Sequence, residues 1–159
     1  MDIYTVSLFG HRNLLNPLSA EERLEREVYK LLKNHGYVNF LMGRTGEFDL
    51  IAALTVRRVM KSYRRFNCSL ILVLPYENKS VEQNRNSFLN LYDEIEICSA
   101  STDAYYKSAF QIRNQNMIDR SDLVLCCIEH ESGGAYQAVQ YAVRQQCKII
   151  NLAEKQMQT

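Results

Sequence analysis

Three glycine-bearing segments of this chain have the composition of an anion-binding site. Ser132-Gly133-Gly134 separates a near-unbroken apolar run from an amphipathic helix pattern. Glycine lets backbone N–H groups approach an anion closely, and a helix that begins there adds the positive end of its dipole. Gly10-His11-Arg12 and Gly43-Arg44-Thr45-Gly46 each follow another apolar run. Any one of these glycines could simply serve a turn, but the three segments together predict a shared pocket for a phosphate or a nucleotide.

Arg113, Asn114 and Asp49 are polar side chains that could complete this pocket. Arg113 lies in a predicted helix that runs opposite to the strands, so its side chain leans toward the glycine-bearing segments. Its guanidinium could bind a phosphate through paired hydrogen bonds; the alternative is an ion pair with a nearby carboxylate. Asn114 could contact the ligand or the backbone of Ser132-Gly133-Gly134. Asp49 is either a carboxylate stabilised by the dipole of its helix or an acceptor for ribose hydroxyls.

Several other side chains near these segments could either bind the ligand or serve the structure alone. His11 could bind a base or a phosphate, or serve the structure alone. Arg44 is a second phosphate candidate or an exposed loop arginine, and Ser132 either joins the anion site or caps its helix. Glu131 would repel a phosphate and is expected to face outward. The sequence shows no Ser or Cys with the two partners of a nucleophilic triad, so no catalytic triad is predicted. Met117 is expected in the core.

Strand and helix patterns alternate along the chain. The predicted strands are residues 2–9, 37–42, 68–74, 94–98, 122–128 and 148–152. The predicted helices are residues 19–36, 46–63, a short one near 80–83, 104–119 and 134–146, with capping residues expected at Ser19 with Glu22 and at Ser80 with Gln83. Strands joined through helices pair in parallel, which predicts an α/β, doubly wound, mostly parallel sheet of about six strands with helices on both faces, a Rossmann-like fold. Ligands bind such sheets at the carboxyl ends of the strands, where the glycine-bearing turns would meet.

Length and composition limit the classes of function. The chain of 159 residues is expected to form one domain, residues 1–153, with a frayed polar tail at 154–159. A net charge of +1 gives no global case for binding nucleic acid or membranes. No signal-peptide pattern opens the sequence, and no apolar run approaches the roughly 20 residues of a membrane span.

The five cysteines are odd in number and form no CxxC pair, and neighbouring Cys126 and Cys127 point to opposite faces of a predicted strand. We expect no metal site, and reduced thiols in a cytoplasmic protein.

Residues 57–65, RRVMKSYRR, form the main basic segment. Positive charge in the second half of a helix complements the helix dipole, so a solvated face explains it. Tyr63 and Phe66 keep a surface for single-stranded nucleic acid open as the alternative. Tyr105 and Tyr106 could cover a base by stacking or belong to the core.

The motifs GHR, MGRTGEFDLIAA, LILVLPYE, RNQNMIDRSD and SGGAYQAVQYA occur in this order over nearly the whole chain. In this the sequence resembles the SLOG superfamily, the Rossmann-like group related to the DNA-processing protein DprA and the cytokinin-activating LOG proteins, and above all its short stand-alone bacterial members. The resemblance implies a pocket for a nucleotide or a nucleotide derivative. LOG enzymes release a base with the help of an arginine, matched by Arg113, and a glutamate. Gln137 and Ala138 stand where that glutamate would be, and a neutral amide cannot act as a carboxylate base.

Three functions follow as hypotheses. The first is a ligand-binding or sensing module for a nucleotide-derived small molecule, which requires no cofactor. The second is an N-glycosidase or phosphoribohydrolase, in which Arg113 and a carboxylate, Asp49 or Glu131, would act. The third is DprA-like binding of single-stranded nucleic acid through the basic segment. A homodimer is expected from related folds, and no membrane partner is expected.

Overall fold

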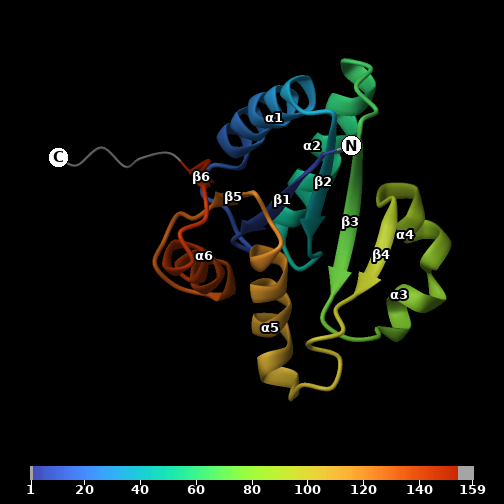
Figure 1. Ribbon diagram of the computed structural model, residues 1–159, viewed down its shortest axis with the longest axis vertical. Helices are drawn as coiled ribbons and strands as arrows, with labels where there is room; N and C mark the ends of the chain where they lie inside the picture. The colour runs from blue at the N-terminus through green and yellow to red at the C-terminus, as the bar shows by residue number, and fades with distance from the viewer. Residues whose placement is uncertain (1, 154–159) are drawn as a thin grey trace.

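A parallel sheet of six strands forms the centre of the described part of the chain, residues 2–153 of this computed structural model (Figure 1). The strands are β1 (Ile3–Gly10), β2 (Tyr37–Met42), β3 (Cys68–Leu74), β4 (Glu94–Ile97), β5 (Leu123–Cys127) and β6 (Ile149–Asn151). The helices are α1 (Pro17–Asn34), α2 (Glu47–Ser62), α3 (Lys79–Gln83), α4 (Arg85–Leu91), α5 (Tyr106–Asp119) and α6 (Gly134–Arg144). The predicted doubly wound α/β fold is confirmed.

The strand order β4-β3-β2-β1-β5-β6 places the first strand in the middle of the sheet. The chain builds outward from β1 to β4, then crosses back to β5 on the other side of β1. Val6 of β1 therefore pairs with Phe40 of β2 on one side and with Leu123 of β5 on the other. The crevice between the carboxyl ends of β1 and β5 is the switch point at which such sheets bind ligands.

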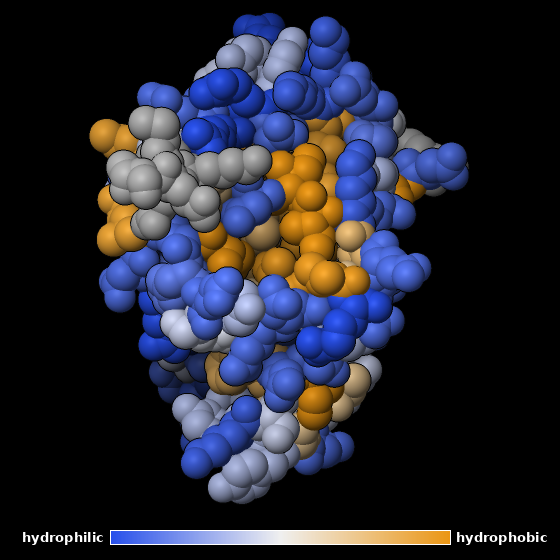
Figure 2. Space-filling view, turned by 90° about the vertical axis from the view of Figure 1, so that its left-hand side faces the viewer, coloured by the Kyte–Doolittle hydropathy of each residue, from blue (hydrophilic) through white to orange (hydrophobic). Residues whose placement is uncertain are grey.

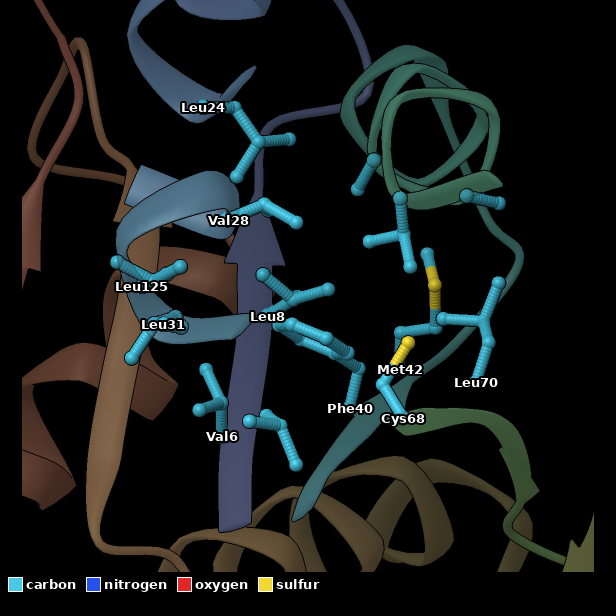
Figure 3. Packing of buried hydrophobic residues seen from close by; sticks show 14 of the residues in the cluster. Val6, Leu8, Leu24, Val28, Leu31, Phe40, Met42, Cys68, Leu70 and Leu125 are labelled. Atoms are coloured by element: carbon cyan, nitrogen blue, oxygen red, sulfur yellow. The ribbon is translucent and has the colours of Figure 1, made fainter. Parts of the chain in front are cut away.

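Two apolar layers hold the helices to the sheet. On one face α1 and α2 pack against alternate strand residues, and on the other face α5 and α6 do the same. Figure 3 shows Leu24 and Val28 of α1 pointing toward Val6 and Leu8 of β1. Burying a side chain of this size contributes about 1.5–3 kcal/mol, so each helix is anchored by several such contacts. Short α3 and α4 lie beyond the β4 edge (Figure 1).

Two expected helix caps are wrong. Pro17 is the first residue of α1, so Ser19 lies within the helix and not before it. The fixed φ of proline suits the first helical position, and Pro17 therefore sets the start. In α3 the side chain of Asn78 accepts a hydrogen bond from the N–H of Val81 at 3.1 Å, so Asn78 caps this helix in place of Ser80.

The sequence predicts one short helix between β3 and β4, whereas the structure has two, α3 and α4. The remaining boundaries differ by a few residues, and the predicted tail at 154–159 lies outside the described residues. None of the helices in the described chain combines the length and the apolar character needed to cross a membrane. At the β6 edge of the sheet, a cluster of apolar side chains ringed by hydrophilic ones reaches the surface (Figure 2).

The five cysteines carry free thiols, and four of them are buried. Burial raises the pKa of Cys68, Cys126 and Cys127 to about 12, which keeps these thiols protonated and unreactive.

Candidate functional site

A cleft of about 640 Å³ opens at the carboxyl ends of β1 and β5. Eleven of the thirteen predicted site residues line it: Gly10, His11, Arg12, Gly43, Thr45, Asp49, Arg113, Asn114, Ser132, Gly133 and Gly134. The other two do not. Arg44 lines two neighbouring hollows, and Gly46 lines one of these two.

The start of α6 has the geometry of an open anion site. Gly133 has a φ of +92°, a conformation that favours glycine, and Gly134 is the first helical residue. A Cβ atom added to either glycine would meet no atom within 4 Å, so the space in front of this turn is free. The first N–H groups of a helix have no acceptor within the helix. In residues 2–153 no other group accepts from Gly134 or Ala135, so these donors remain available.

Ser132 does not cap α6, because Gly133 occupies the cap position and no side-chain bond closes it. The Ser132 hydroxyl instead lies 2.8 Å from Nδ1 of His130. Glu131 is exposed and does not line the cleft, which agrees with the outward orientation expected for it.

The start of α2, by contrast, has its N–H donors occupied. The N–H of Glu47 donates to the carbonyl of Arg12 at 2.9 Å, and that of Phe48 donates to the carbonyl of His11 at 3.4 Å. The positive end of this helix therefore fastens the turn after β1 and is not free to bind an anion.

Gly10 and Gly46 belong to the same tight junction. A Cβ atom at Gly10 would lie 2.2 Å from Cγ of Phe48, and one at Gly46 would lie 2.5 Å from Cα of Arg12. Both glycines thus allow the two turns to pack together, which is the structural role left open in the sequence.

Asp49 fastens the turn before α2 and also lines the cleft. The side chain is 8% exposed, and its Oδ2 accepts hydrogen bonds from the N–H of Thr45 at 2.9 Å and from the Thr45 hydroxyl at 3.4 Å. Its Oδ1 has no donor among the described residues, although Asp49 lines the cleft. Burial raises the pKa of Asp49, and the Thr45 bonds and the charge of Arg113 oppose that shift.

Arg113 is a buried charge, 6% exposed, at the floor of the cleft. Its Nη1 donates to the carbonyl of Val73 at 2.9 Å, and its Nε donates to Oδ1 of Asn114 at 3.1 Å. The predicted alternative, an ion pair, is wrong, since no carboxylate of the described chain lies within 4.0 Å of it. Burial lowers the pKa of Arg113, and the charge of Asp49 opposes this.

The Nη2 of Arg113 has no acceptor among the described residues. Gly43 makes room for this guanidinium, because a Cβ atom there would lie 2.9 Å from Nη1. Asn114 orients Arg113 and makes no bond to the backbone of Ser132-Gly133-Gly134 within residues 2–153. The side chain as a whole is buried, and its charged Nη2 group, without an acceptor in residues 2–153, reaches the open cleft.

His130 is a cleft residue that the sequence did not predict. Its ring stacks on that of His11, with ring centroids 3.7 Å apart and an angle of 8° between the planes. The backbone N–H of His130 donates to Nε2 of His11 at 3.4 Å, which favours the neutral imidazole. Burial lowers the pKa of His11, and the charge of His130 lowers it further. Because β1 and β5 are neighbours, the two histidines that follow them meet.

The basic segment, residues 57–65, lies in and after the second half of α2, away from the cleft at its start. Arg57 donates to the carbonyl of Leu91 at 2.6 Å and pairs with Asp93 at 3.1 Å. Arg58 pairs with Glu21 at 2.7 Å and with Glu25 at 3.4 Å. These two arginines join α2 to neighbouring elements and so are not a freely solvated face.

Two further expectations concern aromatic and metal-binding residues. Tyr105 and Tyr106 are 73% and 67% exposed, so neither belongs to the core, and Tyr106 lines the cleft. Within residues 2–153, no three His, Cys, Asp or Glu side chains gather closely enough to hold a metal ion.

A parallel sheet in this order, with a glycine-bearing cleft at its switch point, defines a Rossmann-like α/β domain. The model of the YpsA family, the YspA SLOG family, matches residues 19–158. The chain therefore belongs to this family, and the expected membership of the SLOG superfamily is confirmed.

Two solved structures share the fold. DNA processing protein A from Helicobacter pylori, studied for its single-stranded DNA binding mode, is 18% identical with a TM-score of 0.66. The similarity covers 98% of this chain and 68% of that protein. DprA from Streptococcus pneumoniae is 9% identical with a TM-score of 0.52, and the similarity covers 94% of this chain but only 59% of that one. No curated protein matches the sequence. At these identities the two structures support the fold alone.

Proposed function

We propose that the protein binds a nucleotide or a nucleotide-derived small molecule in the cleft between β1 and β5. The observation that carries the proposal is the unpaired Nη2 of buried Arg113, next to a cleft that also contains the open start of α6. A buried charge with no carboxylate in direct contact is unfavourable, and an anionic ligand would supply such a contact. Family membership supports the same class of ligand.

Each part of the cleft suits one part of a nucleotide. The N–H groups of Gly134 and Ala135, together with Arg113, suit the phosphate. The unoccupied Oδ1 of Asp49 suits the hydroxyls of the sugar, because a carboxylate accepts hydrogen bonds from them. The stacked pair of His11 and His130 offers a ring surface and hydrogen-bonding nitrogens at the same end of the sheet.

A thermal-shift screen with mononucleotides, dinucleotides, ADP-ribose and dinucleotide cofactors tests the proposal. A ligand at a hundredfold excess over its Kd stabilises the protein by about 2.7 kcal/mol, which raises the unfolding temperature measurably. We expect Arg113→Ala to abolish this shift, because the variant loses the buried donor of the site.

Arg113 also donates a hydrogen bond to the carbonyl of Val73, so its loss could destabilise the free protein. The unfolding temperatures of ligand-free Arg113→Ala and Arg113→Lys are therefore compared first. Lysine keeps the charge but loses the planar fork, and we expect it to retain a reduced shift. A full ligand-induced shift in Arg113→Ala would refute the assigned role.

A second candidate is hydrolysis of the N-glycosidic bond of such a nucleotide, favoured by one observation. Asp49 lines the cleft as a buried carboxyl group with a raised pKa, a combination found at general acid or base residues. Water and a nucleoside monophosphate would then yield the free base and ribose 5-phosphate. Chromatography of the products, with Asp49→Asn as the inactive control, separates turnover from binding, and no release of base leaves binding alone.

Single-stranded nucleic acid is the third candidate, supported by the fold shared with the Helicobacter pylori protein and by the exposed rings of Tyr63 and Phe66. Loss of oligonucleotide binding on neutralising Lys61 and Arg64, together with a steep dependence on salt, would favour it. A cytoplasmic location and a homodimer also belong to the proposal. Buried reduced thiols support the first, and light scattering of the purified protein tests the second.

A further inference from the structure

A second hollow of about 260 Å³ adjoins the cleft at the carboxyl ends of β2 and β3. Four residues line both spaces: Arg12, Thr45, Phe110 and Arg113. Arg44, Tyr76 and Asn78 line the hollow but not the cleft. The cleft and the hollow are therefore neighbouring compartments of one site, with buried Arg113 between them.

Arg12, Arg44 and Arg113 line the hollow, and no carboxylate of the described chain does. None of these three arginines has an ion-pair partner within 4.0 Å in residues 2–153. Like charges that share a small space repel one another, so an anion in the hollow would relieve this repulsion.

Two aromatic rings, those of Tyr76 and Phe110, line the same compartment. The Tyr76 ring meets Phe110 edge to face, with centroids 6.0 Å apart, and lies 6.3 Å from the ring of Tyr106, which lines the cleft. Arg44 also lies over the Phe88 ring, 5.5 Å from its centroid, and Phe88 lines a further hollow beside this one. Rings beside positive charges are the combination that binds the base and the phosphate of a nucleotide unit.

We propose that the site binds a dinucleotide, with one nucleotide in the cleft and the second phosphate and base in the hollow. Arg12 and Arg44 bind the second phosphate, and Tyr76 contacts the second base. The two volumes, about 640 and 260 Å³, lie within the range of roughly 300–1,000 Å³ for small-molecule sites when taken as one space. The inference rests on the proposed function, since it divides that same ligand between two compartments.

Calorimetric titration with the mononucleotides AMP and GMP and the 5′-phosphorylated dinucleotides pApA and pGpG tests this inference at one fixed salt concentration. A charge-assisted hydrogen bond contributes about 1.5–3 kcal/mol, so we expect one dinucleotide to bind at least about tenfold more tightly than its mononucleotide. In Arg44→Gln this gain disappears, while binding of the mononucleotide changes less than about twofold. Arg26→Gln removes an exposed guanidinium of α1 and is the matched control that keeps the gain.

The outcomes distinguish this inference from the function on which it rests. Equal binding of mononucleotide and dinucleotide overturns the second compartment and leaves the proposed function intact. No binding of any of the four ligands overturns both. Affinity that keeps rising from the dinucleotide to a decanucleotide overturns the dinucleotide in favour of an extended nucleic-acid track. An unchanged dinucleotide gain in Arg44→Gln, with an unchanged unfolding temperature, also contradicts the inference.

Discussion

The substitution Gly134→Asp separates anion binding at α6 from the stability of α6. A Cβ atom at Gly134 meets nothing within 4 Å, so the larger side chain fits without repacking. The new carboxylate lies in the first turn of the helix, where the dipole stabilises it by about 0.3–1 kcal/mol. Aspartate also has a better helix propensity than glycine. We therefore expect the free protein to unfold at a slightly higher temperature.

The same carboxylate should weaken ligand binding strongly. Two like charges about 4 Å apart interact with roughly 4 kcal/mol at an effective dielectric constant of about 20. Even half of this value reduces the affinity for a phosphate about thirtyfold. Gly134→Asn is the matched control, because it has nearly the same shape without the charge.

The assay is calorimetric titration of each variant with the tightest ligand of the thermal-shift screen, alongside thermal unfolding of the free proteins. We expect Gly134→Asp to be the more stable variant and the weaker binder, with Gly134→Asn close to the unmodified protein in binding. Equal affinities of the aspartate and asparagine variants would refute an anion site at the start of α6.

Three further predictions concern pH and packing. Because burial lowers the pKa of His11 in the folded state, the unfolded state binds more protons, and stability should be lost as pH falls below about 6.5; thermal unfolding of His11→Phe between about pH 7 and pH 5 should show a smaller loss. Gly10→Ala forces a Cβ atom to 2.2 Å from Phe48 and should destabilise the protein by about 1–3 kcal/mol in urea unfolding, whereas Gly36→Ala, with open space around it, should not. Arg57→Gln should reduce stability by about 1 kcal/mol and leave nucleotide binding unchanged, since Arg57 holds α4 and not the cleft.

One result would contradict each of these three predictions. An acid-induced loss in His11→Phe as large as in the unmodified protein would show that other groups control the pH dependence. An unchanged free energy of unfolding in Gly10→Ala would mean that Phe48 can move aside without cost. Loss of nucleotide binding in Arg57→Gln would place the ligand on the basic segment.

The sequence predicts the fold well because the strand signals are strong. The apolar run of β3, for example, is buried on both faces as its unbroken pattern indicates. The positive φ of Gly133 is not predictable from its place between a strand and a helix, because Gly46 has the same place before α2 and an extended backbone. Helix starts were less predictable, because the residues after β1 and β3 offer several capping side chains and Pro17 and Asn78 prevail.

The sequence predicts most of the residues that line the cleft, but it predicts few of their contacts. The glycine-bearing turns after β1 and β2 look alike in sequence to the one before α6, yet the start of α2 is occupied by carbonyl groups of the first turn. Only the distance between the turns decides this, and local sequence does not contain that distance. The stacked pair of His11 and His130 likewise requires the strand order, in which β1 lies beside β5.

The bond from Arg113 to Val73 shows the same limit. Helix direction predicts that the Arg113 side chain leans toward the strand ends, and it does. Which strand carbonyl it reaches depends on how α5 crosses the sheet. In this structure Nη1 reaches the carbonyl of Val73, and only Nη2 is left without an acceptor among the described residues.

The most direct test of the central claim is an amide NMR titration of the protein with a mononucleotide and, separately, with a single-stranded oligonucleotide. If a nucleotide binds at the cleft, the backbone amide signals of Gly133, Gly134 and Ala135 should shift in a saturable manner on adding the mononucleotide. The side-chain signals of Arg113 should shift at the same concentrations. Unchanged signals at these four residues, with shifts confined to residues 57–65 on adding the oligonucleotide, would contradict the account.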